Sequence, residues 1–264
     1  MTDQLEVTQD RIVADLRTLG VVPGDVLLVH SSLKSLGHVQ GGPNTLIDAL
    51  LEAIGVQGTL VFPAYTGGKV ENVGLDASQR KVYTGIIPET ARRRPDFLYS
   101  PHPFYGIAAR GPLAAELVRL NNTYVFPSAE RKFIYLMMRA GGKALLVGVT
   151  HEANSTIHLV EEFAGLDYKV QDKAWWPLEV EKFLLLPADE QRMMVARHSG
   201  AALPYRIGTH FTAIEEPLVR AGKLTIGKVG AAECRLMRML DVVEVGLAEV
   251  RRNPWFLKTR PEKL

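Results

Sequence analysis

The sequence predicts an α/β fold in which a mixed central sheet is flanked by helices, with an irregular, partly antiparallel C-terminal portion. Three short apolar runs, at residues 26–30, 58–63 and 145–147, alternate with amphipathic segments. Such runs are typical of strands that are buried on both faces of a sheet. The 264 residues, 47% of them hydrophobic, suit a single domain over residues 1–264, or two lobes with the second at roughly 165–225.

The N-terminal part of the chain predicts a helix followed by a βαβ unit. Residues 5–19 have helical apolar spacing and stop at Gly20, and residues 26–30 form the first strand. A loop of small residues leads to a helix that Asn44 or Thr45 caps and Gly55 ends. The strand at residues 58–63 follows. Strand, loop, helix and strand in this order are typical of a βαβ unit.

The middle of the chain predicts a long polar loop, short helices and a buried strand. Residues 64–82 are irregular, and loops of this length often carry function. Helices are expected to begin at residue 87 and to cover residues 113–120 and 134–140, with a loop between the last two. After the strand at 145–147, any of Asn154, Ser155 and Thr156 can cap a helix over residues 157–164.

Beyond Gly165 the pattern is less regular. Strands are expected at residues 175–178, 183–186 and 223–229, and a loop with a helix over residues 207–221. The strongest helical pattern of this part covers residues 231–247. Within it, Cys234 is expected to be a half-buried apolar side chain rather than a nucleophile. Residues 253–256 end the fold, and a tail follows.

Composition and charge argue against several classes of protein. Lys and Arg number 31 and Asp and Glu 29, so we expect neither a nucleic acid nor a membrane as partner. The N-terminus is polar and acidic, unlike a signal peptide, and no apolar run approaches the ~20 residues that span a bilayer. One cysteine cannot form an internal disulfide, which fits a reducing compartment. We therefore expect a cytoplasmic monomer or homodimer that acts on a small molecule.

The helix predicted at residues 157–164 carries a histidine beside a carboxylate. His158 and Glu161 are three residues apart, so their side chains are neighbours, and Glu162 is also within reach. A carboxylate that accepts from one ring nitrogen fixes the tautomer and makes the other nitrogen more basic. The pair follows a strand end, where open α/β sheets place their sites. It predicts a general base, and the alternative is an ordinary surface pair.

The loop after the first strand is a second candidate site. It offers backbone N–H groups and the hydroxyls of Ser31, Ser32 and Ser35, and Gly37 and Gly41 allow a ligand to approach the backbone. A loop between a strand and a helix N-terminus favours phosphate or polar ligands. Neither the P-loop nor the dinucleotide fingerprint is present. A wide connecting loop is the alternative explanation.

Other histidines give weaker signals. His102 lies between two prolines and is either a ligand-facing donor or part of a rigid turn. His30 ends a buried strand and is expected to be a hydrogen-bonded core group. His151 and Glu152 are not followed by a histidine at the spacing of HExxH, so we expect no metal site.

Four segments of the chain have an informative order and spacing: HSSLKSLGHVQGGPNTLIDALLEAIGVQGTLVFPAYT, IIPETARRRPDFLYSPHPFYGIAARGP, LLVGVTHEANSTIHLVEE and GKVGAAECRLM. Together they resemble the aminoglycoside 3-N-acetyltransferase family. The resemblance covers about residues 16–257 and is weakest at 169–212. It implies acetyl-CoA as co-substrate, an amine as acceptor and direct transfer in a ternary complex.

The resemblance also implies roles for particular residues. His158 and Glu161 match the family's central histidine and the acid three residues later. Glu152 stands in place of the family's usual aspartate and, with Tyr65, would contact the acceptor. Donor groups within residues 31–35 are candidates for stabilising the oxyanion. The residues implied to bind the CoA co-substrate are Ser31, Ser32, Ser35, Leu36, Gly37, Val39, Gly41, Ser100 and His102.

The chain departs from the family pattern at several positions. Tyr99 replaces an arginine, Gly106 replaces a serine, and a region that is often acidic reads VARHSGAALPYR. These departures leave open an N-acyltransferase of another aminosugar or amine metabolite, with little antibiotic activity. A CoA-binding protein without catalysis is a third hypothesis, against which the pair of His158 and Glu161 argues.

Overall fold

A seven-stranded mixed sheet forms the centre of the protein within the parts of the chain that the structure describes. This computed structural model describes residues 6–67, 73–76, 79–125, 130, 132–166, 178–198, 205–206, 208–259 and 262–263. The strand order is β3-β4-β2-β1-β5-β8-β7. The sheet confirms the predicted fold class.

The parallel strands lie in the middle of the sheet and the antiparallel strands lie toward its two edges. β2 (Thr59–Pro63), β1 (Val26–Ser31) and β5 (Lys143–Val147) run parallel to one another. The strands that pair antiparallel with their neighbours are β3 (Leu98–Ser100), β4 (Ile107–Arg110), β7 (Thr225–Val229) and β8 (Ala232–Arg238). The strands β3 and β4 were not predicted from the sequence.

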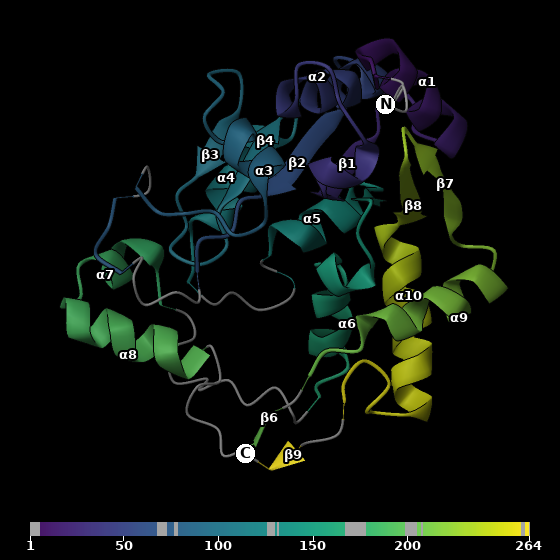
Figure 1. The fold of residues 1–264 in the computed structure, drawn as a ribbon. Helices are drawn as coiled ribbons and strands as arrows, with labels where there is room; N and C mark the ends of the chain where they lie inside the picture. Colours follow the sequence, from purple (N-terminus) through teal and green to yellow (C-terminus); the bar gives the residue numbers. More distant parts are fainter. Residues whose placement is uncertain are drawn as a thin grey trace.

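Helices cover both faces of the sheet, and alternate residues of the central strands point to opposite hydrophobic clusters. Leu27 and Val29 pack with α1 (Gln9–Leu19) and α2 (Pro43–Ile54). Leu28 faces the other cluster. This second cluster contains residues of α4 (Ala114–Asn121), α5 (Phe133–Arg139), α6 (Ile157–Phe163), α9 (Glu215–Arg220) and α10 (Met239–Arg252). Figure 1 shows α1 beside α2 and α6 beside α10.

The predicted βαβ unit is confirmed, with a different start for its helix. The helix α2 begins at Pro43 after Gly42, so neither Asn44 nor Thr45 is its cap. Proline suits the first helical position because its missing N–H would have no helical acceptor there. The Thr45 hydroxyl instead donates to the carbonyl oxygen of Gln40 at 2.5 Å. This contact closes the end of the loop between β1 and α2.

The prediction of one helix over residues 231–247 is wrong. The strand β8 occupies its first half, and α10 begins at Met239. The strand pairs with both β5 and β7, so sheet packing decides the conformation of a segment with ambiguous periodicity. Cys234 is fully buried in β8, and burial raises the pKa of its thiol to about 11. It is therefore not half-buried, and it is not suited to act as a nucleophile.

The region after α6 also differs from the sequence prediction. Residues 183–186 were expected to form a strand, but α7 (Val180–Leu184) occupies most of that span and α8 (Ala188–His198) follows. Phe183 packs on Phe104, with their ring centroids 5.7 Å apart, in a small separate cluster. The strand predicted at 175–178 falls almost entirely outside the described residues. The division into two lobes stays a prediction.

The C-terminal end of the chain is tied back to the fold. The strand β9 (Glu262–Lys263), which falls in the predicted tail, pairs with β6 (Tyr205–Arg206). The predicted strand at 223–229 and the predicted loop and helix before it are confirmed as β7 and α9. None of the helices in the described ranges is both long and apolar enough to cross a membrane.

Candidate active site

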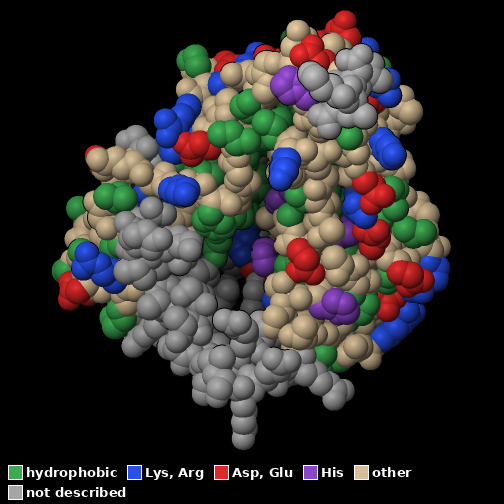
Figure 2. Space-filling model, viewed as in Figure 1, with side chains coloured by type: hydrophobic (Ala, Val, Ile, Leu, Met, Phe, Trp, Pro, Cys, Tyr) green, Lys and Arg blue, Asp and Glu red, His purple; other side chains and the backbone are tan. Residues whose placement is uncertain are grey.

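A pocket of about 350 Å³ opens beyond the carboxyl ends of the three parallel strands. Its wall includes His30 and Ser31 at the end of β1, Pro63 at the end of β2, and Val149 just after β5. Parallel strands end at the same edge of a sheet, so the loops that follow them converge there. Figure 2 shows a hollow in this face of the molecule, with histidine and hydrophobic side chains on its walls.

His158 and Glu161 form a hydrogen-bonded pair at this pocket. Nδ1 of His158 lies 2.7 Å from Oε2 of Glu161, and His158 lines the pocket. The His158 side chain is 44% exposed, whereas that of Glu161 is 0% exposed. A buried carboxylate that accepts from Nδ1 leaves Nε2 of the same ring able to take a proton. The structure therefore brings together the two residues that the sequence singled out.

A lysine and a phenylalanine from distant segments complete the surroundings of this pair. Nζ of Lys258 lies 2.8 Å from Oε1 of Glu161. Phe211, at the start of the 3-10 helix η6 (Phe211–Ile214), contacts the His158 ring edge-on with centroids 5.4 Å apart. The same Lys258 Nζ lies 4.9 Å from the centroid of the Phe211 ring. Sequence analysis missed both residues because they lie far from His158 along the chain, in no recognisable motif.

His30 is a second imidazole in the pocket. Its side chain is buried, and its Nε2 accepts a hydrogen bond from the backbone N–H of Ser155 at 3.3 Å. Burial, reinforced by the nearby charge of His158, lowers the pKa of His30 to about 3. The sequence predicted a hydrogen-bonded core histidine. The burial and the hydrogen bond are as expected, but the ring also lines the pocket.

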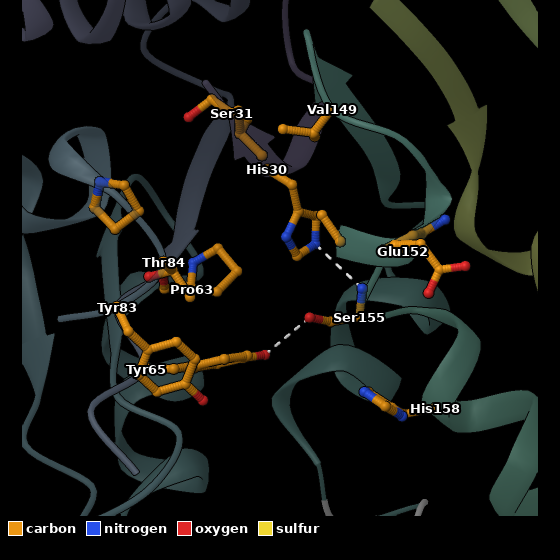
Figure 3. A pocket seen from close by; sticks show the side chains of 14 residues that line it. His30, Ser31, Pro63, Tyr65, Tyr83, Thr84, Val149, Glu152, Ser155 and His158 are labelled. Carbon is orange, nitrogen blue, oxygen red and sulfur yellow. Dashed lines mark hydrogen bonds between the residues drawn. The ribbon is translucent and has the colours of Figure 1, made fainter. Parts of the chain in front are cut away.

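The opposite wall of the pocket is aromatic. Tyr65 and Tyr83 stand close together, with ring centroids 6.4 Å apart, and the Tyr65 hydroxyl donates to Oγ of Ser155 at 3.1 Å (Figure 3). The backbone N–H of Tyr83 donates to the carbonyl oxygen of Tyr65, which fixes the two segments side by side. Burial raises the pKa of Tyr65, so this hydroxyl stays protonated and acts as a donor. Sequence analysis had named Tyr65 but not Tyr83.

Glu152 is the one carboxylate among the described residues that line the pocket. It belongs to the 3-10 helix η4 (His151–Ala153), which follows β5. Its Oε1 accepts a hydrogen bond from the backbone N–H of Thr212 at 3.1 Å. This contact links η4 to η6 and holds the negative charge at the pocket wall. Glu152 is thus placed where an ammonium group could meet it.

The loop after β1 contacts the pocket at its first residue. Ser31 lines the pocket, and its buried Oγ has no hydrogen-bond partner within the described parts of the chain. Ser32 N–H donates to the carbonyl oxygen of Val147, which ties the loop to β5. The Ser35 hydroxyl donates to the carbonyl oxygen of Ser32 at 2.6 Å. Among the three serines, the hydroxyl of Ser31 is therefore the one best placed to bind a ligand.

The rest of the loop is folded against the protein. The 3-10 helix η1 (Leu33–Leu36) ends at Leu36, which is fully buried, and Val39 forms a β-bridge with Val7. Gly37 and Gly41 have φ values of 93° and 77°, which a side chain would disfavour. These four residues shape the loop, and none of them lines the pocket.

Ser100 and His102 lie in a buried network instead of at the pocket wall. Nδ1 of His102 accepts from the backbone N–H groups of Phe104 and Tyr105 at 3.0 and 2.9 Å. Its Nε2 lies 3.1 Å from the carbonyl oxygen of Tyr124, and burial lowers the pKa of the ring to about 4. Both ring nitrogens thus have partners within the protein. For His102 the structure favours the rigid turn over the ligand-facing donor.

The hydroxyl of Ser100 is satisfied in the same way. It donates to Oδ1 of Asn122 at 2.7 Å and accepts from Nδ2 of Asn121 at 2.8 Å. Direct contact of either Ser100 or His102 with the CoA co-substrate, implied by the resemblance, is not supported by this arrangement.

Comparison with known proteins decides the family. A sequence model described as Aminoglycoside 3-N-acetyltransferase matches residues 28–250. The chain belongs to this family. It is 31% identical over 259 residues to aminoglycoside N(3)-acetyltransferase IV of Salmonella sp, covering 98% of this chain and 93% of that protein. It is 29% identical over 268 residues to aminoglycoside N(3)-acetyltransferase VIII of Streptomyces fradiae, covering 91% of each.

Solved structures of the family share this fold. The apoenzyme of aminoglycoside acetyltransferase AAC(3)-IVa superposes with a TM-score of 0.74 at 27% identity, over 97% of this chain and 92% of that one. A histidine-to-alanine mutant of the same enzyme in complex with apramycin gives 0.72 at 28% identity, over 96% of each chain. The resemblance noted in the sequence is thereby confirmed, and the chain is an acetyltransferase of the aminoglycoside 3-N-acetyltransferase family.

Proposed function

We propose that this acetyltransferase moves the acetyl group of acetyl-CoA to the 3-amino group of an aminoglycoside, with His158 as general base. The observation that carries the proposal is the hydrogen bond between Nδ1 of His158 and the buried Glu161 at the edge of the pocket. Family membership supports the reaction, and the complexes of AAC(3)-IVa mutants with apramycin and with a gentamicin support the acceptor class.

The need for a base follows from the chemistry of the acceptor. An amine is mostly protonated near neutral pH, and it cannot attack a carbonyl carbon until it has lost that proton. Nε2 of His158 takes the proton while Nδ1 stays hydrogen-bonded to Glu161. The C–N bond then forms as the C–S bond breaks, and the proton passes from His158 to the departing thiolate. Such proton transfer contributes about 10²–10⁴ to a rate.

The end of β1 fits the acyl donor. Ser31 presents a buried hydroxyl at the pocket with no partner in the described residues, and leaving such a group unpaired costs about 1–3 kcal/mol. A polar group of the bound co-substrate would satisfy it. Acetyl-CoA would supply the activated acetyl group, and the loop that begins at Ser31 would hold its pantetheine arm. Ser32 and Ser35 support that loop through backbone contacts.

The acceptor would sit between Glu152 and the aromatic wall. Glu152 would attract an ammonium group of the substrate, and the rings of Tyr65 and Tyr83 offer a flat face to a sugar. His158 lines the same pocket, so an amine held there is within reach of the base. The direct-transfer route needs no nucleophile from the protein, which agrees with the burial of Cys234.

The charge of the pocket favours a second candidate function. An aminoglycoside carries several ammonium groups, but Glu152 is the one acidic residue among the described lining residues. An aminosugar or another amine metabolite with a single ammonium group would match that charge as well. We therefore propose N-acylation of such an amine, with little antibiotic activity, as the alternative function.

Release of CoA thiol from acetyl-CoA across a panel of amines tests both functions. The panel contains aminoglycosides with and without a free 3-amino group, simple aminosugars and aliphatic amines. Turnover that requires the 3-amino group supports the first function, and turnover confined to the other amines supports the second. Glu152→Gln should raise the KM for the favoured amine about tenfold with little change in kcat, because it removes ground-state binding. An absence of thiol release with every amine would refute acetyl transfer to these classes.

A further inference from the structure

We infer that His30 is a second catalytic imidazole, whose Nδ1–H donates a hydrogen bond to the carbonyl oxygen of the acetyl group during transfer. This inference rests on the proposed function. It assigns to His30 the stabilisation of negative charge that develops on that oxygen as the amine attacks. His30 gains and loses no proton, while His158 carries the proton from the amine to the thiolate.

The hydrogen bond from Ser155 determines which nitrogen of His30 carries the proton. The backbone N–H of Ser155 can only donate, so Nε2 of His30 must be the acceptor and must be unprotonated. In a neutral imidazole the remaining proton then sits on Nδ1. No group in the described parts of the chain accepts from Nδ1, so this donor is available to a ligand.

The geometry directs this donor into the site. His30 lines the pocket together with His158, Ser155 and Tyr65. In Figure 3 the Nε2 edge of the ring faces Ser155, and the Nδ1 edge faces away from it, toward the wall formed by Pro63 and Thr84. An acyl group held near Ser31, the next residue of the same strand, would lie beside this edge.

The ring is also held in the neutral form. The side chain is 8% exposed, and burial together with the charge of His158 places the pKa of His30 near 3. The other titratable side chains that line the pocket are Tyr65, Tyr83, Glu152 and His158. A weakly basic, neutral imidazole is a poor base but a good donor. Environments that differ in this way separate two histidines into a base and an electrophilic donor.

Ser155 couples the two histidines and keeps their spacing fixed. Its N–H donates to His30, its Oγ accepts from the Tyr65 hydroxyl, and its carbonyl oxygen accepts from the backbone N–H of His158. Ser155 itself is 6% exposed. One buried residue therefore sets the positions of both rings relative to each other. Preorganised donors of this kind stabilise developing charge without reorganising during the reaction.

Two substitutions at His30 separate catalysis from structure. The amide of asparagine can place a donor near the position of Nδ1, whereas glutamine reaches the position of Nε2 and keeps an acceptor for Ser155 N–H. We expect His30→Gln to lower kcat about 10²–10³-fold, with the KM values for both substrates changed by no more than a few-fold. His30→Asn should lose about tenfold less than His30→Gln. A purely structural role predicts the reverse order.

The matched control is His210→Gln, the same substitution at an exposed histidine outside the pocket. It should leave kcat unchanged. A His30→Gln variant that keeps the wild-type kcat, or that is more active than His30→Asn, overturns the inference. If wild-type protein transfers acetyl to no amine, the proposed function fails first. That outcome differs from an active wild type whose kcat does not depend on His30.

A measurement on the wild-type protein covers the case in which the variants do not fold. In ¹⁵N-histidine-labelled protein, long-range ¹H–¹⁵N spectra distinguish the two tautomers of each ring. The signal of His30 should show the neutral Nδ1–H form between pH 5 and 8. It should shift when a stable ketone analogue of acetyl-CoA binds. The Nε2–H tautomer, a charged ring in this pH range, or a signal that the analogue leaves unchanged would contradict the assignment.

Discussion

Glu161 is completely buried, yet its Oε2 lies 2.7 Å from Nδ1 of the half-exposed His158. A carboxylate accepts and does not donate, so Nδ1 must carry the proton of the hydrogen bond. The relationship fixes one tautomer and leaves Nε2 as the acceptor. Because Glu161 is held by the helix and by Lys258, the ring orientation follows from the fold and does not depend on the substrate.

Glu161→Gln should abolish most of the activity with little change in shape. A glutamine amide group can donate to Nδ1 and so favour the tautomer that has its proton on Nε2. His158 then cannot accept a proton from the amine. We expect kcat to fall about 10²–10⁴-fold with substrate KM values nearly constant. Steady-state kinetics measure this, and Glu161→Asp serves as the control that keeps the charge. Wild-type turnover by Glu161→Gln would show that the tautomer does not matter.

Lys258→Met should weaken both the fold and the catalytic pair. Lys258 Nζ lies 2.8 Å from Oε1 of Glu161, and its side chain is only 13% exposed. Loss of this partner would leave a buried carboxylate oxygen less well satisfied. The expected cost is about 1–3 kcal/mol of unfolding free energy, measured by urea denaturation. Lys258→Arg, which keeps the charge, should recover much of it. Equal stability of Lys258→Met and wild type would count against the role assigned to this contact.

Gly148→Ala should disturb the loop that begins at Ser31. Gly148 has a φ of 63°, and a Cβ there would overlap Oγ and Cβ of Ser35. We expect a loss of about 1–3 kcal/mol in unfolding free energy and weaker binding of acetyl-CoA, measured by calorimetry. Adding Ser35→Gly removes the overlap but not the backbone strain, so the double variant should recover only in part. Full acetyl-CoA affinity in Gly148→Ala would show that the loop tolerates displacement.

Unfolding free energy should fall as the pH drops from 7 to 5. Burial lowers the pKa of His30 to about 3 and those of His102 and His151 to about 4, below the ordinary value of 6.5. Between these values the unfolded chain binds more protons than the folded protein. The stability that these neutral rings contribute is therefore full above pH 6.5 and is lost as the pH falls toward 4. Each ring adds up to about 1.4 kcal/mol per pH unit.

Urea unfolding at pH 7, 6 and 5 checks this dependence. The carboxyl groups whose pKa values are lowered titrate below this window, so the histidines dominate it. His102→Gln should reduce the slope of unfolding free energy against pH, even if it lowers the stability itself. A flat profile between pH 7 and 5 would show that these histidines are not buried as neutral rings in solution.

The parts of the fold that the sequence predicted correctly are those with strong local signals. The apolar runs of β1, β2 and β5 and the glycine that ends α1 are legible without tertiary information. The strand β8 was mistaken for a helix because its conformation depends on pairing with β5 and β7. Local periodicity does not contain that information.

The candidate site divides in the same way. The pair of His158 and Glu161 follows from three-residue spacing on a helix, so the sequence alone suggested it. Lys258 and Phe211 reach the pair through the folding of distant segments. The location of His30 in the pocket wall depends on which loops close over the end of β1. Contacts between segments so far apart leave no pattern in a single sequence.

The central claim is that His158 removes the proton from the acceptor amine, and His158→Ala tests it most directly. Its affinity for acetyl-CoA should equal that of wild type in a calorimetric titration, because the loop that begins at Ser31 is untouched. In the same preparation, the rate of thiol release with the preferred amine should fall about 10²–10⁴-fold. Wild-type thiol release by this variant would contradict the account, because another group would then be the base.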